Sequence, residues 1–153
     1  MKKIVLLVFG VLLAAFIVIQ FFRIDTTPIP VVQADTIQSA VTVPPDIDMV
    51  LTRSCGDCHT NSTVYPWYSQ VQPVAWWLGN HIAEGRGELN FSTFNTYNAR
   101  RKKKKLEAIC EQVKSSEMPL PSYTWIHRDA ILTDSEKQAI CQWTETASAE
   151  VKE

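Results

Sequence analysis

The sequence predicts an all-α protein with an N-terminal transmembrane helix and a small helical domain. The stretch from Ile4 to Phe22 is apolar apart from Gly10 and Gln20, and it is long enough to cross a bilayer. Farther along the 153-residue chain, several segments repeat apolar residues at helical spacing, and no segment gives a strong strand signal. The formal net charge of −1 gives no overall argument for a nucleic-acid partner, so none is expected.

Residues 1–23 are expected to form a membrane anchor. As a helix, the apolar stretch would be roughly 28 Å long, close to the thickness of the hydrocarbon core. Bulky residues follow it directly, which favours an uncleaved anchor over a removed signal peptide, although residues 32–34 could serve as a cleavage site. Both alternatives export the rest of the chain, and Lys2 and Lys3 favour a cytoplasmic N-terminus.

Residues 24–45 are expected to be a tether, because they contain four prolines and follow no sustained helical or strand period. As a coil, the tether would span about 25 Å, and fully extended it would approach roughly 65 Å. A short edge strand at residues 41–43 is an alternative within this stretch. The domain itself is expected at residues 46–150.

Four helices are expected within the domain. The first begins at about residue 46 and runs into Cys55, with apolar side chains at positions i, i+3 and i+4. The second opens at Pro73 and ends at Gly85, because glycine is common just beyond a helix end.

The third helix is expected at residues 99–115, and the last begins at the capping box of residues 133–136 and frays beyond Ala147. Residues 100–105 place six adjacent cations at the start of the third helix, where the helix dipole disfavours positive charge. Such a run is commonly a solvated face. The alternative is a docking patch for an acidic partner protein or for anionic lipid headgroups.

The first helix ends on Cys55-Gly56-Asp57-Cys58-His59, the Cys-x-x-Cys-His pattern of covalent haem attachment. Two thiols three positions apart lie on one helical turn, so each can add to a vinyl group of the porphyrin, and His59 follows as an axial ligand of the iron. The expected fold is therefore a small cytochrome c-like helical domain around one covalent haem c. A thioredoxin-like redox pair or a zinc site is the alternative, and the adjacent histidine and the absence of a βαβ pattern argue against it.

The opposite side of the iron needs a second axial ligand, and Met118 is the first candidate. It lies in a proline-flanked loop between two predicted helices, and methionine is a usual axial partner in cytochromes c. His81, on the second helix, and His127 are alternative ligands. An open or water-bound iron is a further alternative, in which case Met118 would fill a gap in the core.

Cys110 and Cys141 lie outside the motif and are expected to form a disulfide. Each follows Ala-Ile on the apolar face of a predicted helix, and an even pair of cysteines in an oxidising compartment is commonly joined. Two buried thiols are the alternative. The five tryptophans fit a domain wrapped around a large flat cofactor, or else a tryptophan-rich core.

Further groups of residues accompany the haem motif between residues 47 and 143. They are Asn61-Ser62, Tyr65-Pro66-Trp67-Tyr68, Pro73, Trp76-Trp77, Asn80-His81, Glu84-Gly85-Arg86, Leu89-Asn90-Phe91-Ser92, Glu117-Met118-Pro119, Tyr123, His127, Leu132-Thr133-Asp134 and Ala139-Ile140-Cys141. With the motif, they resemble the bacterial haem-binding domain family of small c-type cytochrome-like domains. The resemblance covers nearly the whole exported domain and implies covalent haem c at Cys55, Cys58 and His59. The basic run is heavier than the family's usual pattern, so a docking role there would be particular to this chain.

The expected function is electron transfer by a membrane-anchored monohaem c-type cytochrome, with redox proteins as partners and no enzymatic activity. The expected location is the bacterial inner membrane, single-pass with the haem domain in the periplasm, or the periplasm itself after signal cleavage. The chain shows no separate set of residues for acid–base or nucleophilic catalysis. The alternative is a haem-based sensor or peroxidase-like protein with an open iron site, in which His81 or Arg86 would assist a bound ligand.

Overall fold

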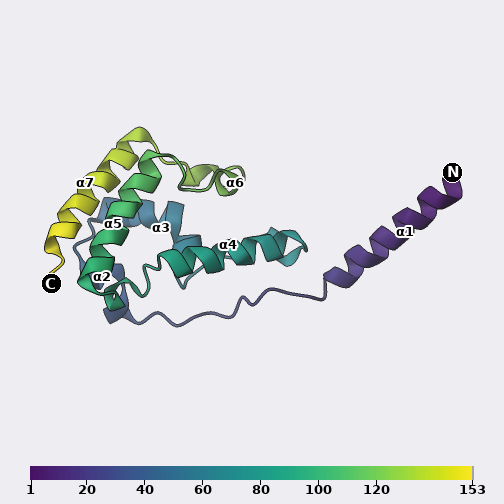
Figure 1. Cartoon of the computed structure of the whole chain (residues 1–153), viewed down its shortest axis with the longest axis horizontal. Helices are drawn as coiled ribbons and strands as arrows, with labels where there is room; N and C mark the ends of the chain where they lie inside the picture. Colours follow the sequence, from purple (N-terminus) through teal and green to yellow (C-terminus); the bar gives the residue numbers. More distant parts are fainter. Residues whose placement is uncertain (153) are drawn as a thin grey trace.

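The computed structural model describes residues 1–152, and every regular element in that range is helical (Figure 1). α1 (Lys2–Ile19) extends away from the rest of the chain and buries none of its residues. By length and composition it could cross a membrane. A signal sequence near an N-terminus meets the same criteria of length and composition. The predicted all-α fold with an apolar N-terminal helix is therefore confirmed.

Most of the domain is built around one hydrophobic core. The helices that share it are α2 (Ile37–Ala40), α3 (Pro45–His59), α5 (Ala99–Lys114) and α7 (Asp134–Glu150). α5 and α7 lie alongside each other and bury Leu106 and Ile140 completely (Figure 1). A disulfide with an S–S distance of 2.03 Å joins the two helices through Cys110 and Cys141, the pair of cysteines outside the haem motif.

Two further helices project from this core toward the side where α1 leaves the domain (Figure 1). They are α4 (Val74–Glu88) and α6 (Pro121–Thr124). α4 packs against α3, and Gly85 lies at the contact, because a Cβ there would be 3.0 Å from the carbonyl oxygen of Cys58. α4 continues beyond Gly85 to Glu88, so the expected helix end at this glycine is wrong. The glycine instead lets the two helices approach closely.

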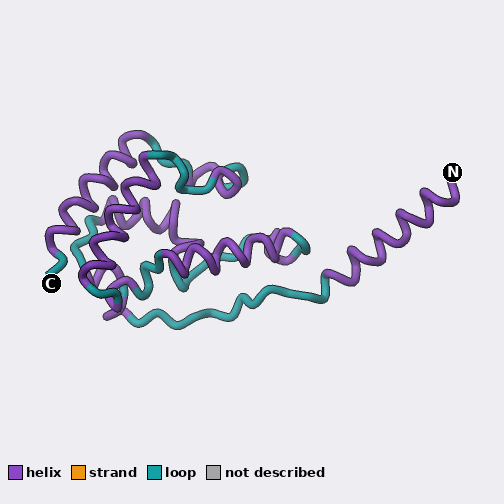
Figure 2. Tube along the Cα trace, in the orientation of Figure 1, coloured by secondary structure: helices purple, strands orange, loops and turns teal. Residues whose placement is uncertain are grey.

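The connections between these helices contain short 3₁₀ turns and irregular backbone (Figure 2). The 3₁₀ turns among residues 1–152 are η1 (Gln33–Asp35), η2 (Trp67–Gln70), η3 (Phe94–Thr96) and η4 (Arg128–Ala130). α7 begins at the predicted capping box: the side chain of Thr133 accepts from the N–H of Glu136 at 3.2 Å, and the Glu136 carboxylate accepts from the N–H of Thr133 at 2.8 Å. The helix continues past the expected end to Glu150.

Residues 33–43 belong to the expected tether, and in the structure they pack on the domain. Ile37 is completely buried, and its N–H donates to the carbonyl of Phe91 at 2.8 Å. Val41, four residues later, is also buried, so one short helical face docks against the core. Prolines and polar residues around this face mask it in the sequence. The chain between α1 and the packed segment is therefore shorter than residues 24–45.

Most of the tryptophans lie outside the core. Trp143 is buried, and its Nε1–H donates to the carbonyl of Thr42 at 2.9 Å. The other four are exposed: Trp67, Trp76, Trp77 and Trp125. The interpretation as a tryptophan-rich core is therefore wrong, and the four exposed indoles need a different explanation.

Candidate functional site

Two adjoining cavities of about 300 and 330 Å³ lie where α3, α4, α5 and the segment after α5 meet. Each falls in the size range of small-molecule sites. Both are lined by Ser54, Cys55, His59, Glu88, Met118 and Pro119. Because they share these residues, we treat them as one groove, called the central groove below.

Both cysteines of the motif line the central groove. α3 includes the whole motif, so Cys55 and Cys58 lie on one face, about one helical turn apart. Burial raises the pKa of the Cys55 thiol to about 12, with a smaller contribution from Cys58, and burial also raises the pKa of Cys58. A thioredoxin-like pair requires a cysteine with a lowered pKa, so both shifts oppose that alternative.

His59 is oriented by α4. Its Nδ1 lies 3.0 Å from the carbonyl oxygen of Gly85 and 2.9 Å from that of Leu89. A carbonyl oxygen only accepts hydrogen bonds, so Nδ1 carries a proton, and in the neutral imidazole Nε2 then keeps its lone pair. Histidines that ligate metals are commonly held in this way through the other ring nitrogen. The close approach at Gly85 thus brings the carbonyls of α4 within reach of the imidazole.

Met118 reaches the central groove from the end of α5. Ser116 has a φ of 60°, in the left-handed region, and it reverses the chain just after the helix. The N–H of Glu117 and the N–H of Met118 then both donate to the carbonyl of Gln112 at 3.1 Å, the first of these being the long bond of a Schellman motif. This helix end holds the backbone of Met118, and its side chain lines both cavities.

His81 and His127 have different surroundings. His81 lines one of the cavities, and its Nδ1 lies 2.9 Å from the carbonyl oxygen of Trp77 on its own helix. His81 lies on α4, the helix that also orients His59 through the carbonyl of Gly85. His127 is absent from the groove lining among the described residues; its Nε2 lies 2.8 Å from the Tyr68 hydroxyl, and its ring stacks on Tyr123.

Asp57 and Tyr123 form a contact whose role the sequence analysis missed. The Tyr123 hydroxyl donates to Oδ2 of Asp57 at 2.7 Å, and the N–H of Val64 donates to Oδ1 at 3.1 Å. Burial raises the pKa of Tyr123 well above its ordinary value, and the hydrogen bond to Asp57 adds to the shift, so the hydroxyl stays a donor. The central residue of the motif therefore ties the segment after Met118 to α3. No local pattern could reveal this, because 66 positions separate the partners.

Arg86 braces the turn that follows the motif. Its Nε–H donates to the carbonyl of Thr60 at 2.8 Å, and its Nη2 donates to Oγ1 of Thr63 at 2.8 Å. The guanidinium is thereby occupied within the protein, and Arg86 is not among the described residues that line the groove. It therefore has a structural role at the motif, in contrast to the ligand-assisting role considered from the sequence.

The basic run of residues 100–105 divides into two groups. Arg101 lies over the ring of Tyr97 at 4.0 Å, Lys102 donates to Asn95 at 2.6 Å, and Lys105 pairs with Glu88 at 3.0 Å. Lys105 and Glu88 both line the central groove. The second group, Arg100, Lys103 and Lys104, lies in a shallow depression between α5 and α7. Glu107, Glu111 and Glu145 line the same depression. One side of α5 thus faces the groove, while the adjacent side carries charges of both signs.

The donor set of the central groove fits a haem. Two thiols on one helical turn match the two vinyl groups of a porphyrin, while an imidazole with a free Nε2 and a thioether are both ligands of haem iron. A family model described as a haem-binding domain matches residues 14–146, which include every residue of the groove. No curated protein and no solved structure matches the chain. From the extent of the family match, the chain belongs to the haem-binding domain family.

Proposed function

We propose that this protein is a membrane-anchored monohaem c-type cytochrome that transfers single electrons, with haem c joined to Cys55 and Cys58. The observation that carries the proposal is the pair of hydrogen bonds from Nδ1 of His59 to the carbonyls of Gly85 and Leu89. They leave Nε2 as the ligating nitrogen at a groove that both cysteines line. A bound haem supplies a one-electron Fe(III)/Fe(II) couple.

Met118 is the second axial ligand in this proposal. His59 is held by α4, whereas Met118 enters the central groove from the end of α5, so the two side chains come from different walls. His81 lies on α4 itself, one helical turn before Gly85, and this placement favours Met118 over His81. A soft thioether stabilises ferrous iron relative to ferric iron and so raises the reduction potential. The contact between Asp57 and Tyr123 restrains the segment that carries Met118.

The covalent attachment and the axial ligand have separate tests. A pyridine haemochrome assay on the denatured protein should show haem that remains attached, and Cys55→Ser with Cys58→Ser should abolish that attachment. Met118→Ala should remove the weak long-wavelength absorption typical of a methionine–Fe(III) bond. The reduced variant should also bind carbon monoxide rapidly, because the distal position is then open.

His81→Ala is the matched control, and it should keep the methionine absorption. A wild-type protein without that absorption, in which carbon monoxide binds rapidly to reduced His81→Ala but not to reduced Met118→Ala, would reverse the assignment. Rapid and complete binding of carbon monoxide by the reduced wild-type protein would instead favour the haem-based sensor or peroxidase-like alternative.

We also propose that α1 is retained as a single-pass anchor in the bacterial inner membrane, with the haem domain in the periplasm. Support comes from Gln72, whose side chain is completely buried and donates to the carbonyl of Phe22 at 3.0 Å. Cleavage at residues 32–34 would remove this acceptor together with Gln20, which exchanges two hydrogen bonds with the backbone of Gln72. The intact mass of the mature haem protein should therefore correspond to a chain that includes residues 1–34. A mass that corresponds to a chain beginning after Ala34 would refute retention.

A redox partner protein is proposed to dock near the basic side of α5. Arg100, Lys103 and Lys104 make no ion pair among residues 1–152, although three glutamates line the same depression. The adjacent side of α5 faces the central groove. An acidic partner bound there would lie next to the groove edge. Its association rate should fall as ionic strength rises, because screening weakens attraction between exposed charges.

A further inference from the structure

The end of α1 is fastened directly to the start of α4. The side chain of Gln20 exchanges two hydrogen bonds with the backbone of Gln72: its Nε2 donates to the carbonyl at 3.2 Å, and its Oε1 accepts from the N–H at 2.9 Å. The carbonyl of Phe22 accepts from the Nε1–H of Trp76 at 2.8 Å as well as from the side chain of Gln72. The domain therefore holds the chain at the point where α1 ends.

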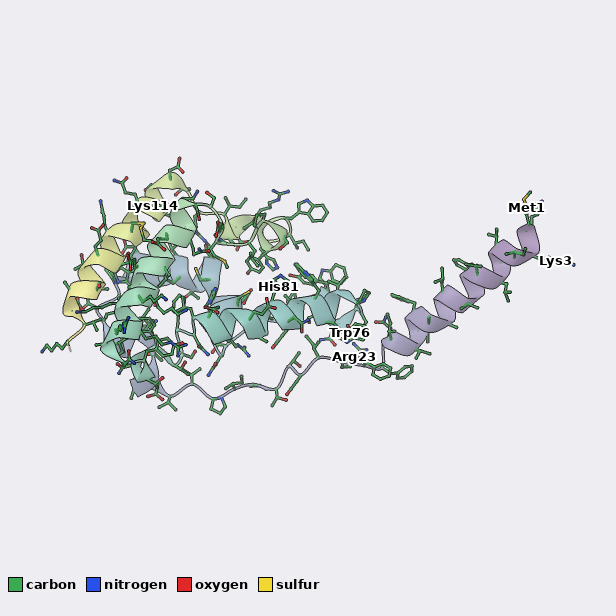
Figure 3. All side chains as sticks on the ribbon, in the orientation of Figure 1. Met1, Lys3, Arg23, Trp76, His81 and Lys114 are labelled. Atoms are coloured by element: carbon green, nitrogen blue, oxygen red, sulfur yellow. A yellow bond between two sulfur atoms is a disulfide. The ribbon has the colours of Figure 1, made fainter. Side chains whose placement is uncertain are left out.

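The chain beyond α1 continues this contact along α4. Arg23 donates to the carbonyl of Gln70 at 2.7 Å, and Figure 3 shows Arg23 and Trp76 close to each other where α1 meets the domain. A Cβ added at Gly79 would be 3.2 Å from Cγ2 of Ile24, so the absence of a side chain lets the connecting segment lie on the helix. A flexible tether would need none of these contacts. The domain is thus held beside the end of the apolar helix.

The four exposed tryptophans gather at this same end of the domain. Trp76 and Trp77 lie on the first turn of α4, which contacts Phe22. Trp67 packs edge-on against Tyr68, whose hydroxyl contacts His127, two residues beyond Trp125. In Figure 1, the start of α4 and the short helix α6 both lie on the side of the domain from which α1 emerges.

The exposure of these indoles is large. Trp67 and Trp125 have relative exposures of 79% and 75%, and Ile126 next to Trp125 has 58%. A grouped set of apolar side chains on a surface commonly marks an interaction site. Tryptophan in particular is favoured at the membrane–water interface, because its ring is amphipathic.

We infer that the end of the domain formed by Trp67, Trp76, Trp77, Trp125 and Ile126 rests on the headgroup surface of the bilayer that α1 spans. The inference rests on the proposed retention of α1 as an anchor. The hydrogen bonds from Gln72 and Trp76 to Phe22 fix this surface at the height where the helix leaves the hydrocarbon. A docking surface for a protein partner would not require the aromatic side chains to gather around the end of the anchor.

Photo-crosslinking tests the inference with the full-length haem protein. The protein is placed in phosphatidylcholine nanodiscs that contain a lipid with a diazirine high on one acyl chain, and labelled peptides are identified by mass spectrometry. Labels are expected on α1 and also on residues 67–77 and 121–126, while the disulfide-linked helices α5 and α7 stay unlabelled. Labels confined to α1 would overturn the inference and leave the aromatic surface to a protein partner.

The failures of the separate proposals give different results in this experiment. A protein without covalent haem absorbance would refute the haem c proposal, whereas an unlabelled α1 would refute the anchor. Only a protein with attached haem and labelled α1, but with unlabelled residues 67–77 and 121–126, contradicts the membrane contact alone.

A variant provides a second measurement. The double substitution Trp67→Ser and Trp125→Ser removes two exposed indoles that neither line the central groove nor contact α1. It should reduce the quenching of a fluorescent headgroup lipid by the haem, because the domain would rest less closely on the bilayer. Met49→Ser, which removes a side chain with 69% exposure from α3, is the matched control and should leave the quenching unchanged. Equal quenching by the wild type and by the double variant would contradict the inference.

Discussion

At the scale of single residues, Gly85 determines how closely α3 and α4 can approach. A Cβ on this residue would meet the carbonyl oxygen of Cys58 at 3.0 Å and the Cβ of Cys58 at 3.3 Å. The backbone of Cys58 cannot move away without shifting the motif. The same approach places the carbonyl of Gly85 against Nδ1 of His59. One missing side chain therefore serves both the packing of the helices and the orientation of the proposed iron ligand.

Gly85→Ala is expected to destabilise the protein by about 1–3 kcal/mol, because it overpacks a close helix contact. Gly87→Ala is the matched control: it lies in the same helix with no atom within 4 Å of the added Cβ, so it should stabilise the fold by about 0.5 kcal/mol. Denaturant unfolding followed by circular dichroism measures both changes. Equal stability of the two variants would show that α3 and α4 can move apart without loss of stability.

At the scale of elements, the start of α7 combines a helix cap with a contact to α3. The carboxylate of Glu136 accepts from the N–H of Thr133 at 2.8 Å, and it pairs with Arg53 of α3 at 2.7 Å. The backbone hydrogen bond, together with the guanidinium, holds the pKa of Glu136 below its ordinary value. The capping box was predictable because its residues are adjacent, whereas the partner on α3 lies 83 positions away.

Because folding lowers the pKa of Glu136, this contribution to stability is present above the ordinary glutamate pKa and is lost as pH falls through the lowered value. Glu136→Gln should therefore cost stability at about pH 6, and the cost should shrink as pH falls through the lowered pKa, because the wild-type carboxyl then becomes protonated as well. Unfolding midpoints of the two proteins across this range provide the measurement. A stability difference that stays constant with pH would indicate that the charge of Glu136 contributes nothing.

At the scale of the whole molecule, the domain consists of a disulfide-linked core and two projecting helices, α4 and α6. The central groove lies between α4 and the core, and the exposed tryptophans lie at the projecting end. The sequence indicated the helical class, the helix that bears the motif and the capping box, because each depends on residues close together in the chain. The packing of Ile37, the role of Gly85 and the exposure of four tryptophans could not be predicted. Each depends on a surface contributed by distant segments, and apolar spacing does not reveal which surface a residue meets.

Removal of the disulfide tests the core as a unit. Its cysteines are 31 positions apart, and loss of a cross-link over such a loop should cost about 3–4 kcal/mol in the chain-entropy model. Cys110→Ser with Cys141→Ser should lower the unfolding midpoint yet keep the proposed covalent haem, since both residues lie outside the motif. Simultaneous loss of the haem at equal expression would show that attachment needs the cross-linked core.

The hydrogen bonds of Gln72 and Trp76 to the end of α1 have a consequence for how the protein, as the proposed electron carrier, would meet its partners. With the domain fastened at the exit of an anchor, encounters with other membrane proteins become a search in two dimensions, governed by lateral diffusion and by surface density. Dilution of the surrounding aqueous phase would then leave the encounter frequency unchanged, whereas addition of lipid would lower it. The length of the segment that connects α1 to the domain would have little influence on the encounter frequency.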